Sequence, residues 1–411
     1  FWGVDVVPKE LVQAVFVLDK IEVKGVLDTL DTKFDVVQFL KDLLDDLKGE
    51  EVNTALRNGY LKVAQHLIDN KCWWDPENAA RFAVKSGKLE VLKYIHEQGA
   101  ILDYEAAYEA ARKGYLDCLQ YIYNTGVVPS LGTHIACLAA ENGHFHILKF
   151  IFENDEHVDT EVCIRAAEGG HLECLKYAHN KGCRLENFIV SRAVGSGKLD
   201  MVRYLHQNSS AADTFACQNA AFYGHLHILQ YLHTNGFHWD MLTCYMAAMR
   251  GHLHCLRYAH EHGCPWEAGL LQAAQRHNHL HILQYAFAHG LSCTGGWWWT
   301  ARNGSVKMLQ FAHEQGCELG TYCVEFAAAA GKLDCLTFLL EIGCPHTDLV
   351  CKNAAAGNHL DCLKYAHEQG CPWDVETTIA AAKVGALRCL QYAVESGCPC
   401  YERTVMAAAS A

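Results

Sequence analysis

Cysteine and histidine are the residues of this chain that could do chemistry, since 411 residues include 21 Cys and 25 His. Thiolates and imidazoles are the usual protein ligands of zinc. His-x-His pairs occur at the start of several second helices, at His144/His146, His225/His227, His252/His254 and His279/His281. Residues two positions apart on a helix are separated by about 200° around its axis, so the two His rings of a pair cannot bind the same ion. We therefore expect the first His to support a turn, the second to face solvent, and no metal site.

Other catalytic patterns are weak. Gly195-Ser-Gly197-Lys198 lacks the preceding spaced Gly and the following Ser or Thr of a phosphate-binding loop. Cys398-x-Cys400 alone does not make a metal site. No Ser/His/Asp or Cys/His nucleophile motif stands apart from the surrounding pattern. The sequence thus predicts a protein that is not an enzyme, with no catalytic residue, cofactor or small-molecule substrate.

These residues sit in a repeat of about 27 residues. We mark each repeat by the residue two places before the Leu of Gly-x-Leu, and this marker is Gly in eleven copies and Asn in two. The markers are Gly59, Gly87, Gly114, Gly143, Gly170, Gly197, Gly224, Gly251, Asn278, Gly304, Gly331, Asn358 and Gly385. Gly and Asn tolerate a left-handed backbone best, so the marker is expected to end one helix and turn the chain into the next.

Each repeat fits two amphipathic helices. The first carries paired small residues before the marker, such as Ala247-Ala248, which let helices approach closely. The second has apolar residues at helical spacing, as in Leu172 to Ala178, and ends at a Gly such as Gly263. Acids at the start of the next unit, such as Asp103, Asp240 and Glu267, are expected to cap its first helix. The pattern predicts an all-α solenoid of about fourteen stacked helix-turn-helix repeats.

Most cysteines occupy two places in this repeat. They lie four or thirteen residues after the marker: Cys118, Cys174, Cys255, Cys335, Cys362 and Cys389, and Cys72, Cys183, Cys264, Cys317, Cys344, Cys371 and Cys398. Equivalent positions in adjacent layers are about 8–10 Å apart, whereas a disulfide needs Cα atoms within about 7 Å. We expect buried, reduced thiols, and hence an intracellular, cytoplasmic protein.

The repeat resembles the ankyrin repeat. Ala-Ala-x-x-Gly-His-Leu, as in Ala247 to Leu253, matches that family's turn between paired helices, and Gly263-Cys-Pro-Trp-Glu267 lies where the family reads Gly-Ala-Asp-Val-Asn. The family's Thr-Pro-Leu-His tetrapeptide is absent, and its usual period of 33 is shortened where its β-hairpin finger lies. The resemblance therefore implies ankyrin-like repeats with tight turns and no long β-hairpin fingers. Such short repeats are similar to families expanded in protists and large DNA viruses, which would place a viral member in the virion or host cytoplasm.

The first fifty residues depart from the repeat. We interpret residues 1–19 as an N-terminal capping helix and residues 20–411 as the solenoid, whose last repeat is truncated after Met406. An alternative is a degenerate F-box-like module beginning at Val7 to Leu11, which would make the chain a substrate-receptor adaptor of a ubiquitin ligase. Phe34 to Leu40 already fits the repeat register, which favours the cap.

Composition limits the partners. The net charge of −13 repels phosphate backbones and argues against nucleic acid. No stretch reaches the roughly 18 apolar residues that a membrane helix needs, so membrane insertion is not expected. No signal peptide is visible.

The most probable contacts lie where the repeat is broken or rich in aromatic residues and Arg. Gly295-Gly296 and three consecutive Trp, Trp297 to Trp299, replace a usual first-helix start, and three helical Trp span about 200°, so at least one is expected to be exposed. First helices nearby carry further candidates on the expected inner, concave side. The predicted protein-binding residues are Phe222, Tyr223, Tyr245, Met249, Arg250, Arg276, Trp298 and Arg302, with Gln275 beside them. The predicted function is a protein-protein interaction scaffold, or a structural part of a large assembly.

Overall fold

The computed structural model describes residues 51–69, 71–154, 159–186, 188–209, 213–293, 295–401 and 404. Within these ranges every regular element is an α-helix, as predicted, and the turns between helix pairs contain no β-hairpin finger. The predicted capping helix at 1–19, the F-box-like Val7 to Leu11, Phe34 to Leu40 and the truncated repeat after Met406 lie outside the described residues.

The chain divides into two compact units, which consist of residues 1–139 with 150–156, and 140–149 with 157–411. The helices α4 to α9 belong to the first unit: α4 (Glu51–Asn58), α5 (Leu61–Asp69), α6 (Ala79–Lys85), α7 (Leu89–Glu97), α8 (Tyr104–Lys113) and α9 (Leu116–Asn124). Two further helices contribute residues to both units, α10 (Gly132–Glu141) and α11 (Phe145–Asn154).

The described residues of the second unit form nine helix pairs after α11. Its helices are α12 (Glu161–Gly169), α13 (Leu172–Asn180), α14 (Ile189–Val194), α15 (Leu199–Asn208), α16 (Ala216–Tyr223), α17 (Leu226–Thr234), α18 (Met241–Arg250), α19 (Leu253–Glu261), α20 (Gly269–Arg276), α21 (Leu280–Ala288), α22 (Trp297–Asn303), α23 (Val306–Glu314), α24 (Thr321–Ala329), α25 (Leu333–Glu341), α26 (Leu349–Ala356), α27 (Leu360–Glu368), α28 (Val375–Lys383) and α29 (Leu387–Glu395).

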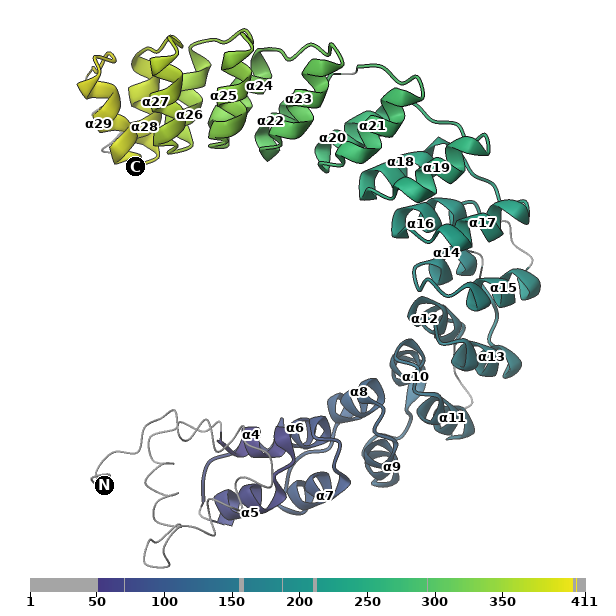
Figure 1. Cartoon of the computed structure of the whole chain (residues 1–411). Helices are drawn as coiled ribbons and strands as arrows, with labels where there is room; N and C mark the ends of the chain where they lie inside the picture. The colour runs from purple at the N-terminus through teal and green to yellow at the C-terminus, as the bar shows by residue number, and fades with distance from the viewer. Residues whose placement is uncertain are drawn as a thin grey trace, which may run out of the picture. The chain divides into compact units, whose positions relative to one another are not determined.

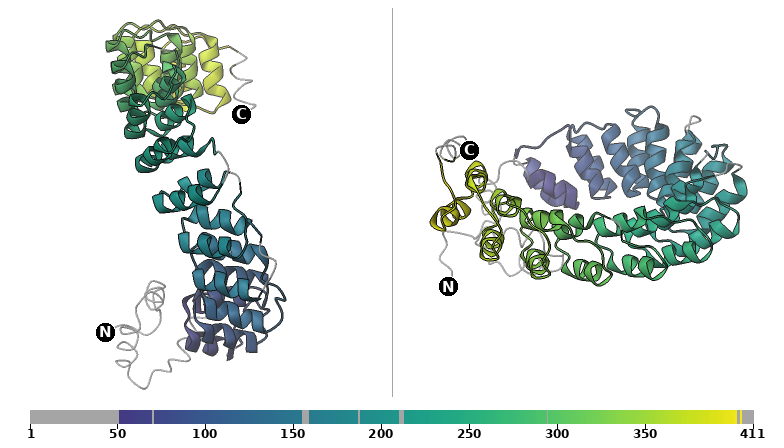
Figure 2. Two further views of the ribbon diagram at one scale, coloured as in Figure 1. Left: turned by 90° about the vertical axis from the view of Figure 1, so that its right-hand side faces the viewer. Right: turned by 90° about the horizontal axis from the view of Figure 1, so that it is seen from above.

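The helices of this second unit form two layers. The first helix of each pair packs against the first helix of the next, as α16 does on α18, and the second helices pack likewise, as α17 does on α19. Figure 1 shows this stack from α12 to α29, and Figure 2 gives two further views of it. The side of the first helices that points away from the second helices is thus left uncovered; we call it the first-helix face.

The core lies between the two layers. Ala247 and Ala248 of α18 are fully buried, as are Cys255, Leu256 and Ala259 of α19. Burying a side chain of the size of Leu contributes about 1.5–3 kcal/mol, and the Ala pair lets neighbouring first helices approach closely. None of the helices in the described ranges is long and apolar enough to cross a membrane.

The marker residues turn the chain as predicted. All thirteen have a positive φ, between +60° and +86°, and each lies between the two helices of a pair. The acid caps are confirmed only in part: Asp103, Asp240 and Asp374 accept hydrogen bonds from backbone N–H groups of the first turn. Ala268, not Glu267, occupies the N-cap position of α20.

We expect Gly251→Ala to lower the melting temperature of the chain. The backbone of Gly251 has φ +77°, and an added Cβ would lie 2.7 Å from the His279 ring of the next repeat. The left-handed backbone alone costs an Ala about 1 kcal/mol, and the contact with the ring adds to this. Thermal unfolding followed by circular dichroism measures the effect. Gly263→Ala is the matched control, since it is as left-handed but has nothing within 4 Å of the added Cβ; equal losses would show that the ring contact is unimportant.

Candidate protein-binding surface

The His-x-His pairs lie at the turns, and their geometry differs from the expected one. His225, His252 and His279 occupy N-cap positions with non-helical backbones, such as φ −85° and ψ 75° at His252. The separation of about 200° around a helix therefore does not apply to these pairs. The two rings of a pair are neighbours, and the ring centroids of His252 and His254 are 5.9 Å apart. The second His is exposed, as predicted. Its Nε2 donates to the marker carbonyl of the preceding repeat, at 3.1 Å from His254 to Gly224.

This arrangement gives the imidazoles structural partners. The ring of each first His packs over the marker Gly of the preceding repeat, as His252 does on Gly224. No three or more His, Cys, Asp or Glu side chains are grouped as metal ligands in the part of the chain that the structure describes.

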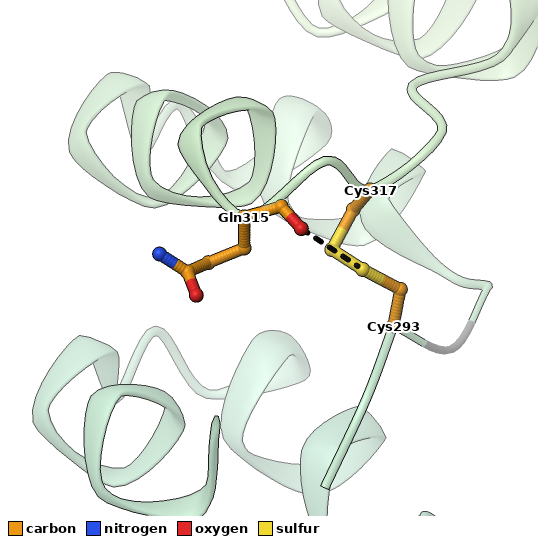
Figure 3. Close-up of a disulfide and its surroundings, with 3 residues drawn as sticks. All are labelled: Cys293, Gln315 and Cys317. Carbon is orange, nitrogen blue, oxygen red and sulfur yellow. Dashed lines mark hydrogen bonds between the residues drawn. A yellow bond between two sulfur atoms is a disulfide. The ribbon is translucent and has the colours of Figure 1, made fainter. Parts of the chain in front are cut away.

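The prediction that all cysteines are reduced is wrong at one place. Cys293 and Cys317 form a disulfide with a Cα–Cα distance of 5.4 Å (Figure 3). They are 24 residues apart rather than 27, so they are not equivalent positions of two layers, and the spacing argument does not cover them. Cys293 lies in the loop before α22, where it is exposed and 3.9 Å from the Gln315 carbonyl oxygen. The oxidised sulfur has no proton to donate, so this is a contact and not a hydrogen bond.

The other nineteen cysteines are free, and all but Cys72 and Cys400 are buried. Burial raises the pKa of Cys118 and of Cys362 to about 11. These groups are therefore thiols and not thiolates at neutral pH, which makes them poor nucleophiles. Here the cysteines are small core residues, as predicted.

A three-residue contact, which we call the His lock, joins successive second helices. His260 of α19 stacks on Trp266 with ring centroids 3.9 Å apart, and its Nδ1 is hydrogen-bonded at 2.9 Å to the Tyr285 hydroxyl of α21. The sets His233, Trp239 and Tyr258, and His367, Trp373 and Tyr392, repeat the same geometry. The recurring His and Trp of the sequence thus hold neighbouring repeats together.

The disulfide lies at the joint where this lock is replaced. Phe287 of α21 stands where the His is expected, Cys293 where the Trp is expected, and Phe311 of α23 where the Tyr is expected. Phe287 and Phe311 pack edge to face with centroids 5.4 Å apart. A covalent bond and an apolar pair therefore replace the polar lock between α21 and α23.

Large apolar side chains follow the first-helix face at one repeat position, nine residues before the marker. Phe188 is 48% exposed, Phe215 50% and Tyr322 64%, and Leu242 and Leu349 are also exposed. Phe188 and Phe215 contact each other with centroids 5.9 Å apart. They line a groove between α14 and α16 together with Arg192, Asn219 and Tyr223. The same position is Gly269 and Gly295 in the two repeats between Leu242 and Tyr322, so the row has two parts. Monomeric proteins rarely expose large apolar patches, so each part suggests an interaction surface.

None of the eight predicted contact residues is buried. Tyr223, Arg250, Arg276 and Arg302 are exposed, and Phe222, Tyr245, Met249 and Trp298 are half-buried. Gln275 is buried, so it is not available to a partner. The structure brings five of the eight together in two clusters, and Tyr223, Tyr245 and Met249 lie outside these clusters.

The first cluster is formed by Arg250 and Phe222 of successive repeats, with the guanidinium 4.7 Å from the ring centroid. The second cluster surrounds Trp299. Arg276 lies 4.8 Å and Arg302 5.8 Å from its ring centroid, and Trp298 stacks on it at 4.1 Å. Trp298 also contacts Phe326 of α24 at 4.6 Å. Trp297 is buried, so one of the three Trp belongs to the core and two are half-buried.

Sequence reasoning missed the exposed row and the central role of Trp299. The signal for the row was present, since Phe188, Phe215, Leu242, Tyr322 and Leu349 share one repeat position whereas core residues hold other positions. The stacking of two Arg on Trp299 had no such signal, because it depends on residues that only one joint contains.

The helix pairs themselves decide the kind of repeat. Each described pair consists of two short antiparallel helices joined at a left-handed Gly or Asn, and it packs on the next pair through its first helix. The repeats are ankyrin-like. Compared with the usual ankyrin repeat, these repeats are shorter between the second helix of one pair and the first helix of the next. A tight turn, such as residues 263–266, connects the two helices there.

Comparisons with known proteins add little to this assignment. No family model and no curated protein matches the chain. Among solved structures it is similar to the crystal structure of the human ASB11 ankyrin repeat domain, with 16% identity and a TM-score of 0.28. The match covers 44% of this chain and 84% of that one. A likeness this low carries no argument, and the ankyrin-like character therefore rests on the helix pairs described above.

Proposed function

We propose that this chain is a non-enzymatic scaffold that binds another protein along the first-helix face of α14 to α24. One observation carries the proposal: exposed apolar side chains recur on that face at one repeat position, at Phe188, Phe215, Leu242 and Tyr322, with Gly269 and Gly295 at this position in the two repeats between Leu242 and Tyr322. Half-buried aromatic residues and Arg side chains lie beside these side chains. Such residues are enriched in the parts of interfaces that contribute most binding energy.

The chemistry of the remaining residues supports a binding role over catalysis. The free buried cysteines are held as thiols, and the imidazoles of the turns and of the His locks contact carbonyl oxygens, hydroxyl groups or rings of neighbouring repeats. Reduced thiols in such number favour an intracellular place of action, which belongs to the proposal. A fixed neighbour in a large assembly would use the same surface.

We expect the double variant R250A/W298A to lose the partner protein while it remains folded. Both side chains lie on the first-helix face, and truncation of an interface Trp or Arg commonly costs about 2 kcal/mol or more, which is about thirtyfold in affinity. Affinity capture with the full chain as bait, followed by mass spectrometry, compares the proteins that wild type and variant retain. Circular dichroism checks that the variant melts as a folded chain.

The matched control is R257A/W73A. Arg257 is exposed on α19, the second helix of the repeat that contains Arg250, and Trp73 is 65% exposed in a loop of the first unit. A partner retained by wild type and by R257A/W73A, but lost by R250A/W298A, supports the proposal. Equal retention by all three proteins would remove the first-helix face from consideration.

A further inference from the structure

Four consecutive repeats of the second unit lack acidic residues around the marker. The segments from two residues before the marker to three after it are 222–227, 249–254, 276–281 and 302–307, and none contains Asp or Glu. They contain Arg250, Arg276, Arg302 and Lys307 and seven His. We call these four segments the basic edge. It stands out because the chain as a whole has a net charge of −13.

Flanking repeats carry an acid at the third residue after the marker. It is Glu173 and Asp200 on one side of the basic edge and Asp334 and Asp361 on the other. In the four repeats between them it is His227, His254, His281 and Lys307. The first turn of the second helix, which favours an acid because of the helix dipole, thus lacks one where the edge is basic.

The Arg residues of the edge also differ from other cations on the first-helix face in their partners. Arg192 of α14 is paired with Glu168 at 3.1 Å, and Lys352 of α26 is paired with Glu376 at 3.5 Å. Arg250, Arg276 and Arg302 have no acidic side chain within ion-pair distance among the residues that the structure describes. They stack on the rings of Phe222 and Trp299 instead.

Stacking leaves the charge available. A guanidinium that contacts an aromatic ring still has N–H groups free to form the paired hydrogen bonds that a carboxylate accepts. Arg276 and Arg302 both lie against a single ring, that of Trp299, and therefore present two such groups close together.

Within three of these repeats, the rings of the edge contact one another. Centroid distances are 6.2 Å from Tyr223 to His225, 6.1 Å from His225 to His227, 5.9 Å from His252 to His254, and 5.8 Å from His279 to His281. Burial lowers the pKa of His279, and the charges of His281, His277 and His252 lower it further. The His residues of neighbouring repeats thus influence the pKa of His279, and no carboxylate opposes them there.

We propose that the basic edge binds an acidic segment of the partner protein, with carboxylates on Arg250, Arg276 and Arg302 and apolar side chains on Tyr223 and Trp298. This inference rests on the proposed function and names the chemistry of its partner. A protein segment fits better than a nucleic acid, because the edge has only four permanent positive charges on a chain of net charge −13, which repels a polyphosphate. Repeats about 10 Å apart match every third residue of an extended chain, which rises about 3.3 Å per residue.

The test uses the full chain and a labelled synthetic peptide of about fifteen residues. The peptide has Glu at every third position, and Phe and Ser occupy the two positions between successive Glu residues. Fluorescence anisotropy measures its affinity. We expect saturable binding that weakens as salt is raised, and a loss of about tenfold or more in R276E/R302E. The same peptide with Gln in place of Glu is expected to bind at least about tenfold more weakly than the Glu peptide.

The matched control is R203E/R257E, which changes the net charge equally on second helices of the same unit. Circular dichroism of both variants checks that they are folded. The inference is overturned by equal effects of the two variants, by equal binding of the Glu and Gln peptides, or by tighter binding of an oligouridylate than of the Glu peptide. Self-association of the free protein that R276E/R302E abolishes would assign the edge to a second copy, and so would also overturn it.

Loss of the natural partner separates the two proposals. If R250A/W298A loses a captured partner while R276E/R302E retains it, the scaffold stands and the acidic segment is wrong. If R276E/R302E loses both that partner and the Glu peptide, the inference is supported together with the scaffold.

Discussion

Reduction of the disulfide between Cys293 and Cys317 is expected to lower the free energy of unfolding of the surrounding repeats by about 3 kcal/mol. The bond closes a loop with a sequence separation of 24 residues, and a cross-link of this length removes about that much conformational entropy from the unfolded chain. The effect is concentrated at this joint because Phe287 and Phe311 replace the polar side chains of the His lock there. No other described joint contains a covalent bond.

Thermal unfolding followed by circular dichroism, with and without a thiol reductant, measures this contribution. Cys293 is exposed, so the reductant has access to the bond without unfolding of the chain. The variant C293S/C317S should melt like the reduced wild type and should not respond to the reductant. If the variant melts like the oxidised wild type, the bond contributes no stability.

His260→Ala is expected to cost about 2 kcal/mol, the second-largest effect. The change removes the ring that stacks on Trp266 and leaves the buried Tyr285 hydroxyl without its hydrogen bond. An unpaired buried hydroxyl costs about 1–3 kcal/mol, and the lost ring contact adds about 1 kcal/mol. Denaturant unfolding measures the difference, with His134→Ala as control because His134 is an exposed helical His outside the locks. Equal losses in the two variants would show that the lock does not stabilise the joint.

The same locks predict that the chain is less stable in acid. Burial lowers the pKa of His260 and of His233 below the ordinary 6.5, and nearby His289 and His262, respectively, lower it further, while Glu261 opposes the effect at His260. The folded chain thus favours neutral rings, so their stabilisation is present above the ordinary pKa and is lost as the pH falls through the lowered one. The melting temperature of wild type should therefore fall more between about pH 7 and pH 5 than that of H233A/H260A.

The repeat could be read from the sequence because its signals are local. Gly251 and Asn278 are residues that tolerate a left-handed backbone, and Ala247 and Ala248 are small where helices approach closely, so helix ends and core positions follow from residue type alone. The exposure of Arg250, Arg276 and Arg302 was likewise predictable, since they lie on the helical side opposite the Ala pair.

The remaining features depend on contacts between repeats that single-repeat patterns do not contain. Cys293 and Cys317 stand at different repeat positions, so a rule about equivalent layers could not pair them. His252 lies before its helix rather than within it, so the helical angle placed its ring wrongly relative to His254. The contact of Arg276 with Trp299 joins one repeat to the next, as does that of Arg57 with Phe82 at the same two repeat positions.

The His lock has a consequence for how this gene can change in length. In each of these locks the His and the Trp belong to one repeat and the Tyr to the next, and the three residues have the same spacing along the sequence. Duplication or loss of one whole repeat between α17 and α21 would therefore place a His and Trp next to a Tyr at the same spacing. The new neighbouring repeats would form a His lock without further mutation. The same event at the Cys293 joint would set Phe287 against a Tyr or leave Cys317 without its sulfur partner, so a change in the number of repeats would preserve the locks but not the contacts of this joint.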